Sequence, residues 1–313
     1  MSIAFIFPGQ GSQAPGMGKG VFDAFAAARE VFEEVDEALG EKLTTLIFEG
    51  PADELTLTAN AQPALMAVSV AAMRALEREF GVGAAKAAYV AGHSLGEYSA
   101  LAAAGALSVT DAAKLLRVRG QAMQAAVPVG EGAMAALIGK VDVAAAEEIA
   151  AKGAEAGACV VANDNNVGNV VISGSKAGID AALAYAKEKG VRAIPLNVSA
   201  PFHSPLMQPA AEAMEAALAK TEIAPLACPL VANVTARPVS EPAAIRKLLV
   251  EQVTGRVRWR ESVEWMATEG GVTRFAETGA GKQLSGMVKR NAPDAEAIAL
   301  NEPSDLETFA KTI

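Results

Sequence analysis

Hydrophobic residues along this chain form short apolar runs that alternate with longer, alanine-rich stretches of helical periodicity. The run Ile3–Phe7 is apolar throughout and ends at a turn-rich segment, so it predicts a short buried strand, as does the run 88–92. Helices are predicted where apolar residues recur with helical spacing, at residues 21–39, 62–80, 98–104 and 110–126. Strands that alternate with helices favour an α/β fold with a largely parallel sheet.

The pattern changes near residue 127. Beyond it we expect a strand at residues 132–138, a helix at 143–153, and a hairpin of strands 159–163 and 169–173 around a turn at 164–168. A second helix at 177–189 and a last strand at 192–198 follow. The order β-α-β-β-α-β is the split βαβ, or ferredoxin-like, arrangement. The α/β pattern resumes after Ser199. We therefore predict a small ferredoxin-like α+β domain (residues 128–198) inserted into a larger, discontinuous α/β domain (residues 1–127 and 199–313).

Composition narrows the class of protein. The 313 residues are 51% hydrophobic and 20% charged, which is typical of a globular chain with a sizeable core. No apolar run reaches the ~18 residues that a membrane span needs. The first residues lack the basic segment of a secretory signal, so the expected location is the cytoplasm.

Charge and cysteine content exclude several further classes. Cys159 and Cys228 do not have metal-site spacing, and the chain has only two histidines, so neither a metal site nor a disulfide framework is expected. The net charge of −9 disfavours general binding to nucleic acid or to an anionic membrane.

Residues 92–96, Gly-His-Ser-Leu-Gly, have the G-x-S-x-G form of a nucleophile elbow, in which a sharp strand-to-helix turn exposes a serine oxygen. A serine hydroxyl needs a base to take its proton, and histidine is the usual base near neutral pH. The candidates are His93 and His203, the two histidines of the chain.

His93 is a poor candidate for the base because adjacent residues project in different directions, which turns its ring away from Ser94. His203 is far away in the sequence, and serves as the base if the fold brings it to Ser94. The alternative at this point is that Ser94 is an ordinary turn residue and that both histidines are structural. The G-x-S-x-G pattern alone is a weak signal.

Five runs together are more specific than the elbow. They are residues 7–13 (FPGQGSQ), 92–98 (GHSLGEY), 117–120 (RVRG), 199–205 (SAPFHSP) and 277–282 (ETGAGK). In order and separation they resemble the malonyl-CoA:acyl carrier protein transacylases of fatty acid synthesis, over essentially the whole chain. The resemblance implies an acyltransferase whose larger domain is α/β-hydrolase-like, with malonyl-CoA and an acidic acyl carrier protein as partners and no cofactor.

The resemblance also implies site residues. Ser94 would attack the thioester and carry the malonyl group as an ester in a ping-pong mechanism, and His203 would be base and then acid. The oxyanion would be bound by the backbone N–H of Leu95, which follows the nucleophile of the elbow, and by that of Gln10. The backbone carbonyl of Gln252 would orient His203.

Substrate selection is expected to depend on Arg119. A buried carboxylate needs a cation, and the planar fork of arginine suits it best. Arg117 and Arg119 lie on different faces of one predicted helix, so one of them can face Ser94, and the family motif matches Arg119. Phe202 favours malonyl by analogy with related polyketide acyltransferases. Asn163 matches a family position beside the acyl chain or pantetheine arm, or is a turn-forming asparagine.

Two other functions remain open at this stage. A serine hydrolase such as a thioesterase would order its triad Ser, Asp or Glu, His, and acidic residues do lie between Ser94 and His203. A degenerate acyltransferase would be a binding scaffold only. Because the carrier is expected to be acidic, docking would need a local basic patch, and the candidates are Arg256, Arg258, Arg260, Lys187 and Lys189.

Overall fold

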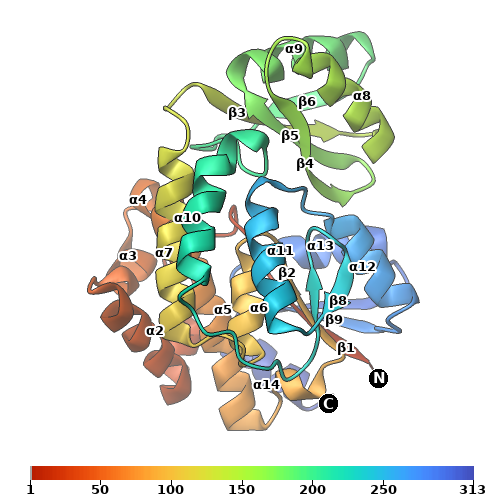
Figure 1. The fold of residues 1–313 in the computed structure, drawn as a ribbon. Coiled ribbons are helices and arrows are strands. Elements are labelled where there is room, and N and C mark those ends of the chain that lie inside the picture. Colours follow the sequence, from red (N-terminus) through yellow and green to blue (C-terminus); the bar gives the residue numbers. More distant parts are fainter. Residues whose placement is uncertain (1) are drawn as a thin grey trace.

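The computed structural model describes residues 2–313 and divides into two parts, each built on its own sheet (Figure 1). The helices and strands of the smaller part, at the top of Figure 1, lie within residues 132–195, and the larger part below it contains all other elements. Among residues 2–313, no helix is both long and apolar enough to cross a membrane.

The larger part contains a six-stranded sheet in the order β10-β9-β1-β2-β7-β8. Its strands are β1 (Ile3–Phe7), β2 (Tyr89–Gly92), β7 (Leu230–Ala232), β8 (Arg237–Val239), β9 (Arg274–Thr278) and β10 (Glu296–Leu300). All neighbouring strands are parallel except β8, which runs antiparallel to β7 at the edge. The predicted α/β class with a mainly parallel sheet is confirmed. Strands covered on both faces read as continuous apolar runs, which explains the first run of the sequence.

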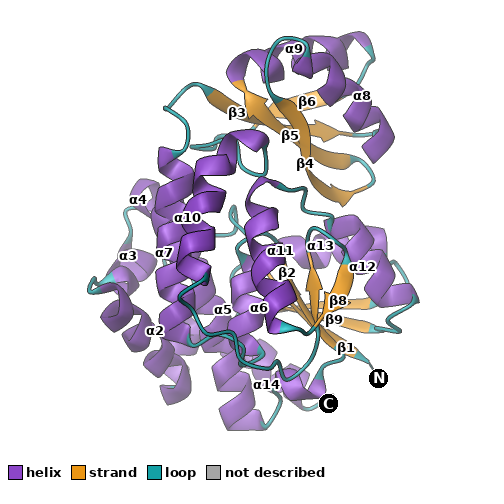
Figure 2. Ribbon diagram, viewed as in Figure 1, coloured by secondary structure: helices purple, strands orange, loops and turns teal. Residues whose placement is uncertain are grey.

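Helices cover both faces of this sheet (Figure 2). The helices of the larger part are α1 (Lys19–Ala24), α2 (Ala26–Leu39), α3 (Leu43–Glu49), α4 (Ala52–Thr56), α5 (Thr58–Phe80), α6 (Gly96–Ala103), α7 (Val109–Ala125), α10 (Gln208–Leu218), α11 (Pro242–Thr254), α12 (Trp259–Thr268), α13 (Gln283–Asn291) and α14 (Pro303–Ala310). Alternate residues of β1 enter two cores: Phe5 and Phe7 pack with α5 to α7, and Ala4 and Ile6 pack with α12 and α13.

The prediction of one continuous helix over residues 21–39 is wrong. The chain forms two helices there, because Phe25 has an extended backbone (φ −123°, ψ 124°) between α1 and α2. Its ring packs edge-on against Phe80, with the ring centroids 5.9 Å apart. An aromatic contact with a distant helix therefore overrides the local periodicity.

The smaller part is an antiparallel sheet in the order β4-β5-β3-β6, with both helices in the predicted β-α-β-β-α-β sequence. Its elements are β3 (Gly132–Ile138), α8 (Val143–Ala154), β4 (Cys159–Asn166), β5 (Asn169–Ser175), α9 (Lys176–Glu188) and β6 (Arg192–Pro195). Two predicted boundaries are wrong. The turn predicted at 164–168 is mostly strand, because β4 continues past two register shifts to Asn166. The last strand ends at Pro195, after which the chain turns toward the cavity described below.

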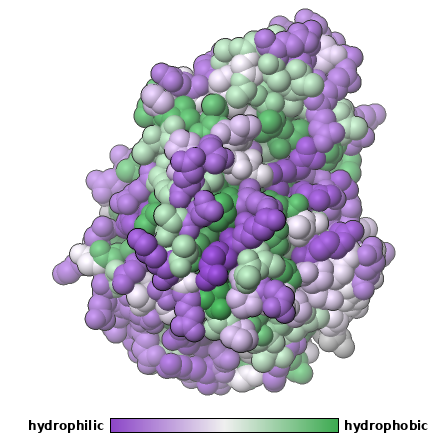
Figure 3. Space-filling model, viewed as in Figure 1, coloured by the Kyte–Doolittle hydropathy of each residue, from purple (hydrophilic) through white to green (hydrophobic). Residues whose placement is uncertain are grey.

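Strand β4 joins the two parts. The backbone N–H of Asp164 donates to the Val257 carbonyl at 2.9 Å, and the Val257 N–H donates to the Ala162 carbonyl at 2.8 Å. The buried Asp164 carboxylate also pairs with Arg260 of α12 at 2.9 Å. On the face drawn in Figure 3, hydrophobic residues gather where the two parts meet, and hydrophilic residues predominate at the lower left. The two parts are thus held together where β4 lies beside Val257 and α12.

Candidate active site

The sharp turn between β2 and α6 presents Ser94, whose φ of +52° lies in the left-handed region that is strained for a side-chain-bearing residue. The positions on either side of the turn, Gly92 and Gly96, have room only for glycine. A Cβ on Gly92 would lie 1.9 Å from the carbonyl carbon of Gly96, and a Cβ on Gly96 would lie 2.3 Å from the Phe7 carbonyl oxygen. The G-x-S-x-G segment is therefore a nucleophile elbow in geometry as well as in sequence.

His203 is the histidine that reaches this serine, with its Nε2 at 2.8 Å from Ser94 Oγ. Its Nδ1 lies 2.9 Å from the Gln252 carbonyl oxygen and 3.1 Å from that of Gly255. Carbonyls only accept, so Nδ1 carries the proton and Nε2 is free to accept one from the serine. Burial, and then the charge of Arg119, lowers the pKa of His203 to about 3, so the ring is neutral at physiological pH.

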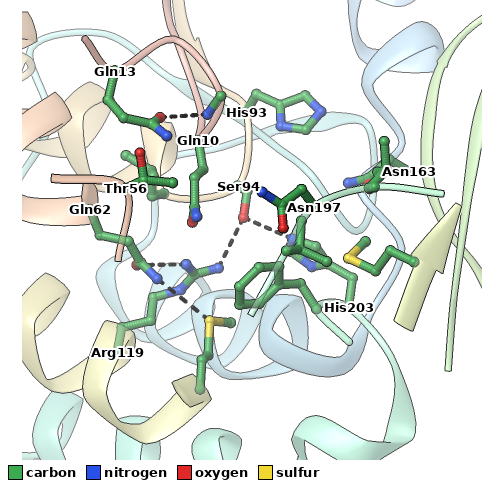
Figure 4. Close-up of a pocket in the computed structure, with 17 residues that line it drawn as sticks. Gln10, Gln13, Thr56, Gln62, His93, Ser94, Arg119, Asn163, Asn197 and His203 are labelled. Atoms are coloured by element: carbon green, nitrogen blue, oxygen red, sulfur yellow. Dashed lines mark hydrogen bonds between the residues drawn. The ribbon is translucent and has the colours of Figure 1, made fainter. Parts of the chain in front are cut away.

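His93 occupies a separate position beside the site. Its Nε2 lies 2.9 Å from Asn165 Oδ1, and its ring packs near Trp259 with centroids 5.7 Å apart. Figure 4 shows the ring turned away from the Ser94–His203 pair. The prediction that neighbours in the elbow diverge is confirmed.

Arg119 extends from α7 to the serine, and is 1% exposed. Its Nη2 donates to Ser94 Oγ at 3.1 Å, and its Nη1 donates to Gln62 Oε1 at 2.8 Å (Figure 4). Nη2 also donates to Gln252 Oε1 at 2.8 Å. Arg117 points elsewhere and donates to the Ala59 carbonyl at 2.8 Å. The fold therefore selects Arg119, as the motif implied.

Gln252 is fully buried rather than a surface residue, and it binds both the base and the arginine. Besides its backbone bond to His203, its side-chain Nε2 donates to the Ser94 carbonyl at 2.9 Å and to the carboxylate of Glu97. These contacts hold Oε1 in place to accept from Arg119. One glutamine thus fixes both side chains that contact Ser94 Oγ.

Glu97 and Asn233 complete the support under the elbow. Asn233 Oδ1 accepts from the Ser94 N–H at 2.8 Å, and Asn233 Nδ2 donates to the Gly92 carbonyl at 2.7 Å. The backbone N–H of Asn233 donates to Glu97 at 2.6 Å. Burial raises the pKa of the Glu97 carboxyl to about 8, so this group carries only part of its charge near neutral pH.

Two backbone N–H groups near the serine are free to bind an oxyanion. Neither the N–H of Leu95 nor that of Gln10 donates to an acceptor within residues 2–313, and both residues line the cavity around Ser94. The Gln10 side chain is held by Thr58, whose hydroxyl donates to Oε1 at 2.9 Å. The loop that follows is held by Gln13, which accepts from the Gly11 N–H at 2.7 Å.

The cavity above Ser94 has a volume of about 320 Å³ and lies between the two parts of the molecule. Its apolar wall includes Phe202 together with Met123, Met134, Leu196 and Val198. Asn163 lines this cavity and a second one of about 160 Å³ that shares Gln10 and His93 with it. Asn163 lies within β4, so the alternative that it forms a turn is wrong.

No group of three or more side chains that could hold a metal ion occurs within residues 2–313. The basic patch expected for docking is also largely neutralised. Arg256, Arg258 and Arg260 pair with Glu147, Glu261 and Asp164, respectively, and Lys189 pairs with Glu148. Only Lys187 of that set is exposed without an ion pair among the described residues. Because each of these cations is paired with a carboxylate, it contributes little positive potential to attract an acidic carrier protein.

Comparison with known proteins supplies the family. An acyl transferase domain model matches residues 4–299. A malonyl CoA-acyl carrier protein transacylase of Bacillus subtilis (strain 168) is 48% identical, over 99% of this chain and 97% of its own length. The chain belongs to the malonyl-CoA:acyl carrier protein transacylase family. The resemblance drawn from the five runs is thereby confirmed.

Solved structures agree with this transacylase assignment. The acyl-carrier-protein S-malonyltransferase from Bartonella henselae superposes with a TM-score of 0.97 at 55% identity, covering 100% of this chain and 99% of that one. A malonyl-transacylase solved in complex with a type II PKS acyl-carrier protein superposes with a TM-score of 0.95 at 39% identity, covering 100% of both chains.

Several residues of the site were not predicted from the sequence, among them Gln62, Glu97, Asn233 and Gly255. A signal existed for two of them. Glu97 lies inside the elbow run, and Asn233 directly follows an apolar strand, where ligand sites of parallel sheets gather. Gln62 and Gly255 carry no local signal, because only the packing of α5 and α11 brings them to Arg119 and His203.

Proposed function

We propose that this chain transfers the malonyl group from malonyl-CoA to the phosphopantetheine thiol of an acyl carrier protein through a malonyl ester on Ser94. The observation that carries the proposal is a single oxygen, Ser94 Oγ, bonded to both a neutral histidine and a buried arginine. The first partner activates a nucleophile and the second selects an anionic acyl group. The family and the activities named for its relatives support the same reaction.

The site residues have these proposed roles. Ser94 Oγ attacks the thioester carbonyl while its proton passes to His203 Nε2. The carbonyl oxygen becomes an oxyanion, bound by the N–H groups of Gln10 and Leu95. The carbon–sulfur bond then breaks, and the proton on His203 moves to the departing CoA sulfur. The carrier thiol repeats these steps in reverse order and frees Ser94, which makes the mechanism ping-pong.

The proposed acyl selectivity rests on Arg119, Phe202 and Asn163. The guanidinium of Arg119 pairs with the malonyl carboxylate, Phe202 closes the apolar side of the cavity, and Asn163 contacts the pantetheine arm at the cavity mouth. Gln252 and His93 are supporting residues, the first by orienting His203 and Arg119 and the second by packing beneath the mouth. Every proton and electron pair in these steps is supplied by substrate or side chain, so the reaction is proposed to need no cofactor.

The finer description of the fold is also a proposal. The order β4-β5-β3-β6 and the β-α-β-β-α-β sequence support a ferredoxin-like domain over residues 128–198. An elbow after the central strand β2 supports a hydrolase-like larger domain, residues 1–127 and 199–313. The cytoplasmic location stays a prediction.

The alternative reaction is hydrolysis, since the same malonyl-serine ester could be released by water. The test is to load the enzyme with malonyl-CoA, remove free CoA, and divide the sample between buffer and holo-carrier protein. We expect the malonyl group to move to the carrier thiol much faster than it appears as free malonate. Equal rates of malonate release in both samples would identify a thioesterase instead.

The carrier is proposed to dock beside α13. Gln283, Leu284 and Met287 of this helix line the second cavity, and Arg290 follows on the same stripe at helical spacing. Lys282, Lys289 and Arg290 are exposed and form no ion pair within residues 2–313. They are therefore free cations on the helix that lines this opening, which an acidic carrier could contact.

Charge reversal tests this surface. The double variant Lys289→Glu/Arg290→Glu is expected to raise the KM for carrier protein by about tenfold, with an effect that weakens as salt rises. Formation of the malonyl-enzyme from malonyl-CoA should keep its wild-type rate. Lys86→Glu/Lys220→Glu, at two exposed cations outside both cavities, is the control with the same change in net charge. An unchanged KM for the carrier in the double variant would remove α13 from the docking surface.

A further inference from the structure

Arg119 acts on Ser94 itself as well as on the space where an acyl group binds. Ser94 Oγ accepts from Arg119 Nη2 at 3.1 Å on one side and lies 2.8 Å from His203 Nε2 on the other (Figure 4). A hydrogen bond from a cation draws electron density from the oxygen that must attack. The contact therefore opposes nucleophilic attack while it lasts.

The same guanidinium also opposes the acylation step as a whole. As Ser94 Oγ bonds to the carbonyl carbon and gives its proton to His203, the negative charge moves to the carbonyl oxygen, and a positive imidazolium is left beside a positive guanidinium in a buried site. Like charges at low dielectric repel strongly. After burial, the charge of Arg119 is the largest cause that lowers the pKa of His203.

We propose that Arg119 restrains the Ser94–His203 pair until the carboxylate of the acyl group neutralises it, so that the malonyl carboxylate promotes the chemical step as well as binding. This inference rests on the proposed function and deepens it, because it places acyl selectivity in the rate of acylation. A neutral acyl group would enter the cavity and meet a restrained nucleophile.

The geometry of the guanidinium supports this competition. Both two-pronged edges of an arginine, Nη1/Nη2 and Nε/Nη2, include Nη2, whose two hydrogens go to Ser94 Oγ and Gln252 Oε1. Gln252 is fixed by its own bonds to the Ser94 carbonyl and Glu97. Ser94 Oγ is therefore the partner that a bidentate carboxylate would displace. The buried Nε has no acceptor among the described residues, and a carboxylate on that edge would provide one.

The other charged and titratable groups nearby do not cancel this effect. Glu97 and Tyr98, both from α6, face Arg119, and burial raises the pKa of each. Both groups therefore tend to be neutral, which leaves the charge of Arg119 incompletely balanced. His93 is the other titratable group that faces His203, and burial lowers its pKa, so it too tends to be neutral. The carbonyls of Gln252 and Gly255 raise the pKa of His203 but by less than burial and Arg119 lower it.

A neutral ester tests the restraint without any carboxylate. We would measure acylation of Ser94 by p-nitrophenyl acetate from about pH 2.5 to about pH 9 in the wild type and in Arg119→Gln, a range that includes the His203 pKa of about 3. On the pH-independent plateau of the rate profile, Arg119→Gln is expected to acylate several-fold faster than the wild type. The acid limb, where the rate falls because His203 is protonated, should move up by about one pH unit or more, because His203 becomes a stronger base. A slower plateau with an unmoved limb would overturn the proposal.

Two matched variants separate charge from structural damage. Arg119→Lys keeps a cation and is therefore expected to acylate more slowly than Arg119→Gln with the neutral ester. Arg117→Gln removes an arginine of the same helix that contacts the Ala59 carbonyl instead of Ser94, and should leave both plateau and limb unchanged. If Arg119→Gln, Arg119→Lys and Arg117→Gln all accelerated acylation alike, the acceleration would come from loosening of α7 and the proposal would be wrong.

The two histidines also allow a direct measurement. Imidazole ¹⁵N signals of the wild type, assigned with a His93→Gln variant, would be titrated with malonate or with the neutral analogue acetamide present. Malonate is expected to raise the pKa of His203 by about one unit or more and acetamide, which has no carboxylate, to leave it unmoved. No change with malonate, in an enzyme that still transfers malonyl groups, would contradict the restraint and leave the proposed function standing. Loss of malonyl transfer itself would contradict the proposed function.

Discussion

Replacing either Ser94 or His203 with alanine is expected to lower the rate of malonyl transfer by on the order of 10⁵-fold, and replacing both to lower it little further. The reason is that the 2.8 Å contact makes the two side chains one chemical unit. Without the serine no ester forms, and without the histidine the serine proton has no acceptor. The measurement is the initial rate of carrier malonylation in the three variants.

The comparison variant is His93→Ala, which removes the other histidine of the site. It should lose less than about tenfold, because its ring contacts Asn165 and Trp259 and not Ser94. Activity losses that multiplied in the Ser94/His203 double variant would show that the two residues act independently. That outcome would require a different base.

Replacing Arg119 with alanine is expected to reduce kcat/KM for malonyl-CoA by about 10²- to 10³-fold, or about 3–4 kcal/mol, and to retain or raise that for acetyl-CoA. Arg119 is buried, and Gln62 and Gln252 hold its fork at Ser94. A malonyl carboxylate deprived of this cation would be buried unpaired. An acetyl group has no such penalty.

The two substrates must be measured side by side with the same carrier. Arg117→Ala is the control on the same helix, since its guanidinium contacts the Ala59 carbonyl and Glu41 rather than the serine. Equal losses for malonyl-CoA and acetyl-CoA in the Arg119 variant would contradict the carboxylate role. They would show that Arg119 only supports the elbow.

The core of the site was predictable because its signals are local or few. Gly92 and Gly96 bracket Ser94 for reasons of space that operate within one turn, and the chain has only one histidine that is not adjacent to that serine. The side-chain role of Gln252 was not predictable. It depends on α11 carrying a single residue to the carbonyl of Ser94, the carboxylate of Glu97 and the guanidinium of Arg119 at once.

The fold shows the same division between local and distant causes. The strand Ile3–Phe7 was found because a strand buried on both faces is apolar throughout. The break at Phe25 was not, since it follows from a contact with Phe80 of another helix. The polar end of β4 reads as a turn in sequence, but Arg260 of α12 pairs with Asp164 and makes it a buried strand.

The central claim is that Ser94 carries the malonyl group between two thiols. Intact-mass measurement after brief mixing with malonyl-CoA, followed by peptide mapping, tests it most directly. We predict one malonyl adduct per chain, located on Ser94, that disappears when holo-carrier protein is added as the carrier gains the same mass. An enzyme that malonylates its carrier at full rate with no adduct on Ser94 would contradict the account.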